Sequence, residues 1–286
     1  MPRSRLETAA SAAPVAPATS VTPRRRRSRI GRTLGRPAYV GIAAATFVVL
    51  IAVWWLVGAL ELTDPSFLPG PGAVLSALGE QAANGELWAD IGVSSFRILM
   101  GFAIATVMAI PIGTLMGVNA RVEAALEPLM DFIRYMPVVA FVPLTIVWVG
   151  IDENQKFLII WMGTFFQQVL MVADAVRRTP RTLVSLGETL GLSWVQLLVR
   201  IVVPSAMPRI WDALRITLGW AWTWLVVAEL VAASSGMGYR ITVAQRFFET
   251  DLIIGYVFVL GVLGLILDQV MRAAGRRMFA YQEGRS

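Results

Sequence analysis

The sequence contains no cysteine, no histidine and only one lysine among its 286 residues. Without thiols or imidazoles the chain cannot form a disulfide, a zinc site that uses histidine, or a Ser-His or Cys-His nucleophile pair. The lysine, Lys156, follows Glu153-Asn154-Gln155 with no glycine-rich loop before it, which excludes the phosphate-binding loop of a P-loop NTPase. We therefore predict that the chain is not an enzyme and binds no metal or cofactor, and that any ATP and Mg²⁺ are bound by another subunit.

Charged residues are also scarce. They make up 15% of the chain against 56% hydrophobic residues, whereas about a quarter of the residues of a soluble domain are charged. The net charge of +6 could suggest a nucleic-acid partner, but the cations gather at the ends of apolar runs, as in membrane proteins. The composition therefore predicts an integral membrane protein in contact with lipid and not with nucleic acid.

Six apolar runs predict the fold class, an all-α polytopic membrane protein with six transmembrane helices. The first run has 23 uncharged residues, which matches the roughly 20 residues that cross a bilayer and exceeds the apolar core of a signal peptide. The later runs are shorter and have polar flanks, which is typical of helices inside a bundle. The runs are residues 38–60, 98–118, 135–151, 157–173, 216–228 and 252–267.

The basic residues predict the orientation. With the N-terminus in the cytoplasm, the inside segments hold 21 of the 25 basic residues and the outside segments hold 4, so both termini are expected to be cytoplasmic. Residues 1–37 are Arg-rich without an apolar period and are predicted to be a disordered cytoplasmic arm, which we favour over a transit peptide. Residues 38–273 form the predicted permease domain, and residues 274–286 the cytoplasmic tail.

Two loops are long enough to fold. The outside loop contains a Pro-Gly turn cluster at 68–72 and then a short helix expected at 73–83. The inside loop predicts a helix from about 181 to 190, a break at Gly191, a second helix from Ser193 to about 203, and then Pro204 and Pro208. The Ser193 hydroxyl is expected to cap the second helix by accepting from the amide of Gln196 or its neighbour.

This inside loop carries a resemblance to a known family. Gly191, Ile201 and Val203-Pro204 lie in the register of the cytoplasmic EAA loop of permeases of bacterial ABC importers, where glycine is followed by Ile and then Leu-Pro. The loop departs from the family at Ser185-Leu186-Gly187, where Glu-Ala-Ala is usual, with Glu188 directly after. Four further segments make residues 40–280 resemble the nitrate/sulfonate/taurine branch: Phe67-Leu68-Pro69-Gly70-Pro71, Val142-Pro143-Leu144, Trp148-Val149-Gly150-Ile151 and Val227-Ala228-Glu229-Leu230.

The resemblance implies a permease of the bacterial inner membrane that forms the path of a small anionic solute, such as taurine, another sulfonate or nitrate, by alternating access. It also implies a homodimer, two separate ABC ATPase subunits and an extracytoplasmic solute-binding protein. A loop with a rigid tip could transmit motor movements to the spans, and we expect this coupling-helix loop within 177–210 to dock on the ATPase through Glu188, Leu190, Gly191, Leu192, Ser193, Trp194, Ile201 and Pro204. The alternative is a secondary transporter or channel without an ATPase, or a simple amphipathic connector at this loop.

Polar and aromatic residues inside the spans are the candidates for the substrate pathway. Glutamines are costly in lipid, and tryptophans alternating at 220, 222 and 224 cannot share one helix face. Glu229 ends an uncharged run of 13 residues, and is expected to be either a gate or packing residue, or an interfacial carboxylate bonded to a backbone amide. The predicted candidates are Asp131, Arg134, Met136, Gln167, Gln168, Trp220, Trp224 and Glu229.

Overall fold

The structure is a computed structural model that describes residues 35–280. Most of the predicted N-terminal arm and the last residues of the predicted tail therefore lie outside the described residues. The chain divides into two units, residues 1–49 and 50–286. Within the described range every regular element is helical, as the apolar runs predict.

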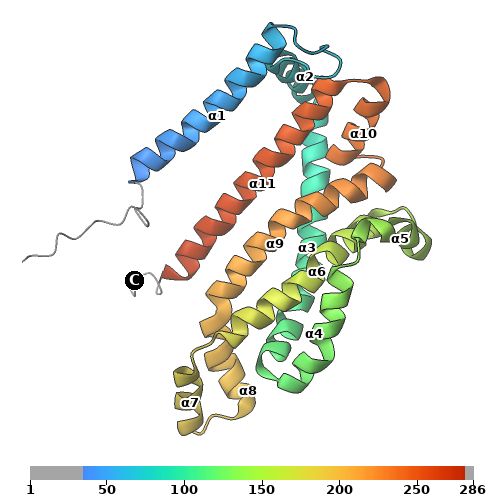
Figure 1. Ribbon diagram of the computed structural model, residues 1–286. Coiled ribbons are helices and arrows are strands. Elements are labelled where there is room, and N and C mark those ends of the chain that lie inside the picture. The colour runs from blue at the N-terminus through green and yellow to red at the C-terminus, as the bar shows by residue number, and fades with distance from the viewer. Residues whose placement is uncertain (1–34, 281–286) are drawn as a thin grey trace, which may run out of the picture. The chain divides into compact units, whose positions relative to one another are not determined.

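The helices follow the predicted order along the chain (Figure 1). They are α1 (Arg36–Ala59), α2 (Pro71–Ala83), α3 (Glu86–Val118), α4 (Ala120–Arg134), η1 (Val138–Phe141), α5 (Val142–Val149), α6 (Glu153–Arg177), α7 (Arg181–Thr189), α8 (Trp194–Leu197), η2 (Leu198–Val202), α9 (Val203–Ala232), α10 (Met237–Phe247) and α11 (Thr250–Met278). The helix predicted in the outside loop is α2.

Five helices in the described part of the chain are long and apolar enough to cross a membrane: α1, α3, α6, α11 and the continuous helix from Trp194 to Ala232. A sixth span is possible only as a bent pair, α4 with residues 138–149, which meet at 85°. The run at 135–151 is thus not a straight helix. Pro137 disfavours helical backbone at the residue before it, and itself takes an extended conformation (ψ 113°) before η1.

The second helix of the inside loop does not end near residue 203, as we expected. It continues from α8 through the π-helical segment η2 into α9, with Pro204 in the first turn of α9 and Pro208 inside it. A π-helical turn already departs from the regular pattern of amide donors, so a proline directly after it costs less than one inside an undisturbed helix. The loop is therefore joined to a span by continuous helix.

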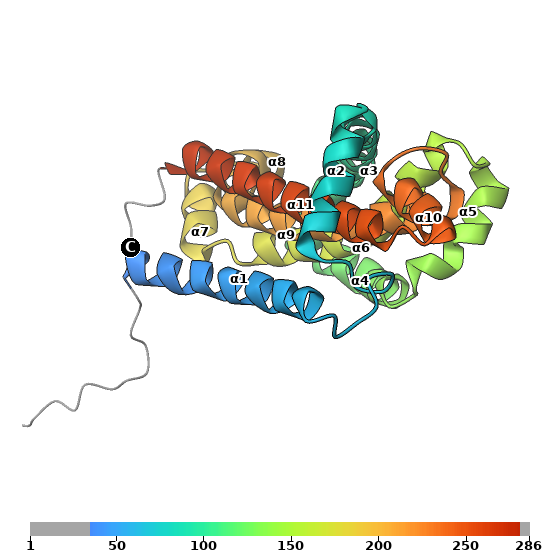
Figure 2. The ribbon, with the colours of Figure 1, turned by 90° about the horizontal axis from the view of Figure 1, so that it is seen from above.

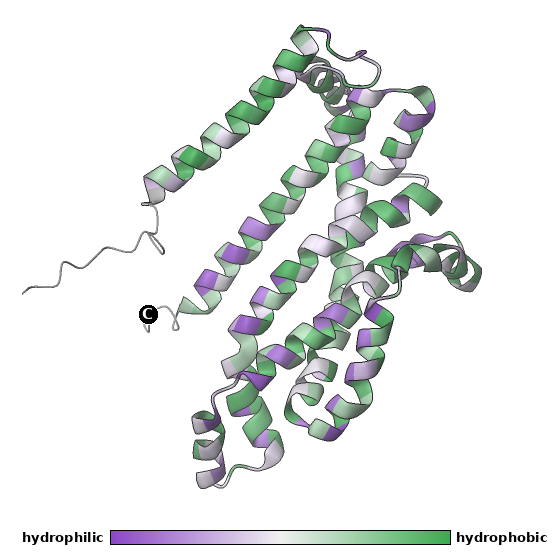
Figure 3. Cartoon of the chain, in the orientation of Figure 1, coloured by the Kyte–Doolittle hydropathy of each residue, from purple (hydrophilic) through white to green (hydrophobic). Residues whose placement is uncertain are grey.

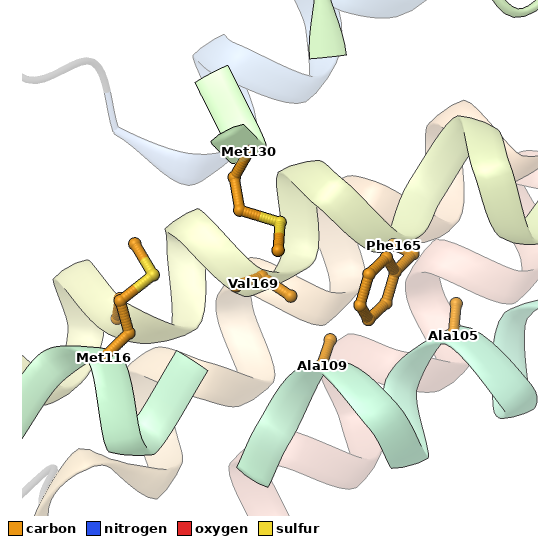
Figure 4. Packing of buried hydrophobic residues seen from close by; sticks show 7 residues of the cluster. Ala105, Ala109, Met116, Met130, Phe165 and Val169 are labelled. Carbon is orange, nitrogen blue, oxygen red and sulfur yellow. The ribbon is translucent and has the colours of Figure 1, made fainter. Parts of the chain in front are cut away.

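The closest helix packing is between α3 and α6. Small residues recur every four positions along α3, at Gly101, Ala105, Ala109, Gly113 and Gly117. A Cβ added at Gly113 would lie 2.6 Å from the Val169 carbonyl oxygen of α6, so the two backbones are nearly in contact, as is usual where membrane helices associate. Around this stripe pack Met116, Met130, Phe165 and Val169 (Figure 4).

Helix α6 also packs against α9 on its other side. Helix α11 in turn packs against α9 (Figures 1 and 2). The α6–α9 contact also needs a glycine, because a Cβ at Gly163 would lie 2.2 Å from the Trp224 ring. Hydrophobic residues cover most of α1 and α11 (Figure 3), and many of them are exposed, as expected for surfaces in lipid. Within unit 2 the helices thus place α6 between α3 and α9.

Candidate functional site

A cavity of about 400 Å³ lies where α4 ends and the chain bends into η1, facing α6 and α9. Five of the eight predicted pathway residues line it, together with Tyr135 and Thr223. These five are Arg134, Met136, Gln167, Trp220 and Trp224. The cavity therefore combines one cation with amide, hydroxyl and aromatic groups, which can recognise a small polar solute.

Arg134 is the charged group of this cavity. It occupies the last turn of α4, where the helix dipole favours a cation. Its guanidinium donates to Gln167 Oε1 (3.3 Å) and to the Tyr135 hydroxyl (3.1 Å), and lies 4.8 Å from the centre of the Tyr135 ring. Asp131, three residues earlier on the same helix face, forms an ion pair with Arg134 at 2.9 Å. Three neighbours thus hold the guanidinium in place while about a third of the side chain stays exposed.

The other three predicted pathway residues do not line the cavity. Asp131 contacts it only through Arg134. Gln168 is buried, and its Oε1 accepts from Thr106 on α3 at 3.4 Å. Glu229 is buried in an ionic network described below. Trp222 packs among α10 and α11 residues, so the alternating tryptophans do point to different faces.

The network around Glu229 joins three spans. Arg97 of α3 donates to Glu229 at 2.8 Å and to Glu153 at 2.7 Å. Glu229 also accepts from the Ser94 hydroxyl and from the Gly238 amide, both at 2.8 Å. Arg97 and Glu229 are each only 1% exposed. Glu229 is therefore buried between helices and bonded to a backbone amide, and its role as a gate stays a prediction.

Arg97 was missed because it lies just before an apolar run and was counted with an outside loop. A second cluster lies on α3 one turn before Ser94, where Asp90 accepts from Arg240 (3.1 Å), the Tyr256 hydroxyl (2.9 Å) and the Gly236 amide (3.1 Å). Burial, the largest single influence, lowers the pKa of the Arg240 guanidinium, but the hydrogen bond to Asp90 and the negative charges of Asp90 and Glu86 together outweigh it and raise this pKa. The spacing Asp90, Ser94, Arg97 puts three polar residues on one helix face, and this signal was available in the sequence.

The inside loop is fixed by two local motifs. At the end of α7, Gly191 adopts a left-handed conformation (φ +71°). The amide of Leu192 donates to the Gly187 carbonyl (3.1 Å) and that of Gly191 to Glu188 (2.9 Å), which is a Schellman motif. Ser193 then caps α8 in a capping box with Gln196, as predicted. The turn between the helices is therefore rigid.

The tip of this loop has exposed apolar side chains. Leu190 is 69% exposed, Trp194 53% and Val195 60%. Glu188, Ser193 and Pro204 are exposed as well, whereas Leu192 and Ile201 are half-buried. Gly187 is buried, and a Cβ there would lie 2.6 Å from Ile201 Cδ1. The departure from the family sequence at this position therefore suits close packing of α7 on η2.

The family described as "Binding-protein-dependent transport system inner membrane component" matches residues 109–280. The chain belongs to this family. A probable ABC transporter permease protein of Brucella abortus (strain 2308) is 37% identical over 244 residues, 85% of this chain and 96% of the relative. The taurine transport system permease protein TauC of Escherichia coli (strain K12) is 34% identical over 84% of this chain and 89% of the relative.

A solved structure of the MetNI methionine ABC transporter in an inward-facing conformation has a TM-score of 0.56. The alignment covers 67% of this chain and 94% of the chain in that structure. At 18% identity this similarity shows the fold alone. This inner membrane component is therefore an all-α, multi-pass permease of the inner membrane, and its family consists of transport components and not of enzymes. Both the cavity and most of the ionic network lie in residues that the family match covers, while Arg97 lies before them.

Proposed function

We propose that this permease forms the path of a small anionic solute in an ABC importer and moves it by alternating access, driven by separate ATPase subunits that bind ATP and Mg²⁺. The cavity beside Arg134 is the observation that carries the proposal. Sulfonates, nitrate and bicarbonate each present oxygen atoms with one negative charge, which suits a guanidinium held by Gln167 and Tyr135. TauC, a relative at 34% identity, is described as a taurine transport permease.

The wall opposite Arg134 restricts the size of the solute. Trp220 and Trp224 of α9 line the same cavity, and the packing of Trp224 on Gly163 fixes that ring. A rigid aromatic wall fits a short aliphatic or planar body attached to the anionic group. The pair Asp131–Arg134 neutralises part of the charge, which favours passage over tight retention of the solute.

We expect Arg134→Gln to lower solute uptake about tenfold or more, because a charge-assisted hydrogen bond contributes about 1.5–3 kcal/mol. Arg134→Lys should retain part of the activity, since it keeps the charge but loses the planar fork. The measurement is uptake of taurine, an alkanesulfonate, nitrate and bicarbonate by the assembled transporter in proteoliposomes. Arg121→Gln is the matched control, because Arg121 is an exposed arginine on the same helix. Equal uptake by Arg134→Gln and Arg121→Gln would rule out this cavity as the anion path.

The inside loop is the proposed contact with the ATPase. Its turn is held by the Schellman motif and the capping box, its tip is apolar and exposed at Leu190 and Trp194, and it continues as helix into α9. A force applied at the tip is thus transmitted along α9 toward Trp220 and Trp224. This placement, together with the excess of basic residues on the same side, supports cytoplasmic termini.

Two copies of the chain are proposed for the complete transporter, with two ATPases below and a solute-binding protein outside. One copy would supply one wall of the path, the cavity lined by α4, η1, α6 and α9. A two-fold dimer is the commonest way to close such a site. The proposed cofactor of the assembly, ATP with Mg²⁺, belongs to the ATPase subunits.

The absence of native cysteine makes the docking testable with single-cysteine variants. We expect Trp194→Cys, at an exposed tip residue, to crosslink to the co-expressed ATPase. Trp88→Cys, at a tryptophan near the start of α3 that is exposed to 64%, should not. If Trp194→Cys reacts only with a lipid-phase probe, the loop lies in the membrane interface and the docking proposal fails. Uptake that continues without any ATPase would favour the secondary transporter instead.

A further inference from the structure

A groove of about 380 Å³ lies between the ends of α9 and α11, away from the cavity beside Arg134. Three arginines line it: Arg215 from α9, and Arg272 and Arg276 from α11. Trp211 forms an aromatic wall, because its indole donates to the Met271 carbonyl of α11 at 2.8 Å. The groove is therefore cationic on two sides and closed by a fixed ring.

The depth of this groove in the membrane follows from where the uncharged stretches of α9 and α11 end. Arg215 Nη1 lies 3.5 Å from Asp268 Oδ1, and each of the two residues ends an uncharged stretch. Residues 216–228 of α9 and 252–267 of α11 carry no charge, and they extend for roughly 20 and 24 Å at 1.5 Å per residue. The Arg215–Asp268 pair thus marks the boundary between the apolar and polar zones, where phospholipid headgroups lie.

The charged side chains of the groove do not balance, because there is one more cation than there are anions. Asp268 pairs with Arg215 and, at 3.2 Å, with Arg272, while Asp212 lies 3.8 Å from Arg215. Arg276 has no ion pair or hydrogen bond within residues 35–280. Arg215 Nε is buried and donates no hydrogen bond in the same range. Three guanidiniums and two carboxylates give a local charge of +1, which one phosphodiester would neutralise.

We propose that this groove binds the phosphate of one anionic phospholipid, whose acyl chains run along the exposed apolar side chains of Ile216 and Leu265. Basic pockets between spans at the cytoplasmic side hold anionic lipid headgroups in this manner. The lipid joins α9, which carries the inside loop and the tryptophans of the cavity, to α11. The site is independent of which solute the permease carries and of the ATPase.

A glycine on α11 makes the groove possible. A Cβ at Gly275 would lie 2.8 Å from the Trp211 ring, so a larger residue would push the ring away from α11. This close contact holds the ring in the groove, which Arg215 of its own helix and Arg276 of α11 also line.

The test is native mass spectrometry of the full-length protein in dodecyl maltoside, titrated with phosphatidylglycerol or phosphatidylcholine. We expect phosphatidylglycerol to bind about tenfold more tightly, and Arg276→Gln to weaken it about fivefold, since a cation near a lipid surface contributes about that factor. Arg277→Gln is the matched control, because Arg277 is exposed on the same turn of α11 but does not line the groove. It should change binding less than twofold.

Three outcomes would overturn the proposal. Equal binding of the two lipids would show that the groove does not distinguish an anionic headgroup from a zwitterionic one. If Arg276→Gln and Arg277→Gln weakened phosphatidylglycerol binding equally, the binding would depend on the total charge at the end of α11 and not on the groove. Inorganic phosphate that displaces the lipid at similar concentration, or binding that appears only after removal of residues 281–286, would assign the groove to a free anion or to the chain's own terminus.

Discussion

Replacing Arg97 by glutamine is expected to destabilise the protein by about 3–5 kcal/mol, the usual cost of leaving a buried charge without its partner. Glu229 would keep the Ser94 hydroxyl and the Gly238 amide as donors, but would lose its only ion-pair partner in the described chain. At about 2–4 °C per kcal/mol, the unfolding midpoint should fall by roughly 10 °C. Thermal unfolding of the purified protein in detergent measures this.

The reverse substitution should cost less. In Glu229→Gln, Arg97 still pairs with Glu153. The buried guanidinium therefore keeps an ion-pair partner, and the carboxylate of that partner is half exposed to water. The double variant Arg97→Gln with Glu229→Gln should be more stable than the two single effects predict, because contacting residues are not additive. Arg246→Gln, an exposed arginine of α10, is the control and should change stability by less than about 0.5 kcal/mol.

The network also contacts the segment between α9 and α10. Arg97 Nη1 also donates to the Ser235 carbonyl at 2.6 Å, and a Cβ at Gly236 would lie 2.4 Å from Glu229 Oε1. The segment between α9 and α10 is therefore folded over the ion pair. If Arg97→Gln unfolded at the wild-type temperature, the pair would not be a stability determinant, and a role confined to transport would remain.

Features that depend on neighbouring residues can be predicted from this sequence. The run at 38–60 is α1, and Ser193 caps α8 because a hydroxyl and an amide three residues apart need no tertiary information. The spacing of Asp131 and Arg134 was sufficient for their ion pair. Each of these features depends on residues within one or two helical turns.

Contacts between residues far apart along the chain cannot be predicted from the sequence in this way. Arg97 and Glu229 are separated by 132 positions, and no helical period connects them. A rule that counts basic residues in loops assigns an arginine at the edge of an apolar run to water, whereas here a carboxylate of another span takes the place of water. The span predicted at 135–151 is found as one arm of a bent pair with α4, because hydropathy does not register what Pro137 does to the backbone before it.

The stripe of small residues on α3 gives the second large expected effect. Gly113→Leu should prevent α3 and α6 from reaching their observed separation, because the new Cβ would lie 2.6 Å from the Val169 carbonyl oxygen and 2.8 Å from the Val172 Cβ. The first of these atoms is backbone and cannot rotate away. Overpacking costs about 1–3 kcal/mol where side chains can adjust, and occasionally more, so we expect the upper end of this range or beyond.

A matched substitution on the same helix separates this effect from that of a leucine as such. Gly92 is exposed on α3, and nothing lies within 4 Å of a Cβ built there, so Gly92→Leu should unfold near the wild-type temperature. Gly113→Ala should fall between the two, since it adds the clashing Cβ without the rest of the side chain. The yield of monodisperse protein and the unfolding midpoint of the three variants give the order. Equal midpoints for Gly113→Leu and Gly92→Leu would mean that α3 and α6 can move apart at little cost, and a mobile α3–α6 contact would then have to be part of the transport movement.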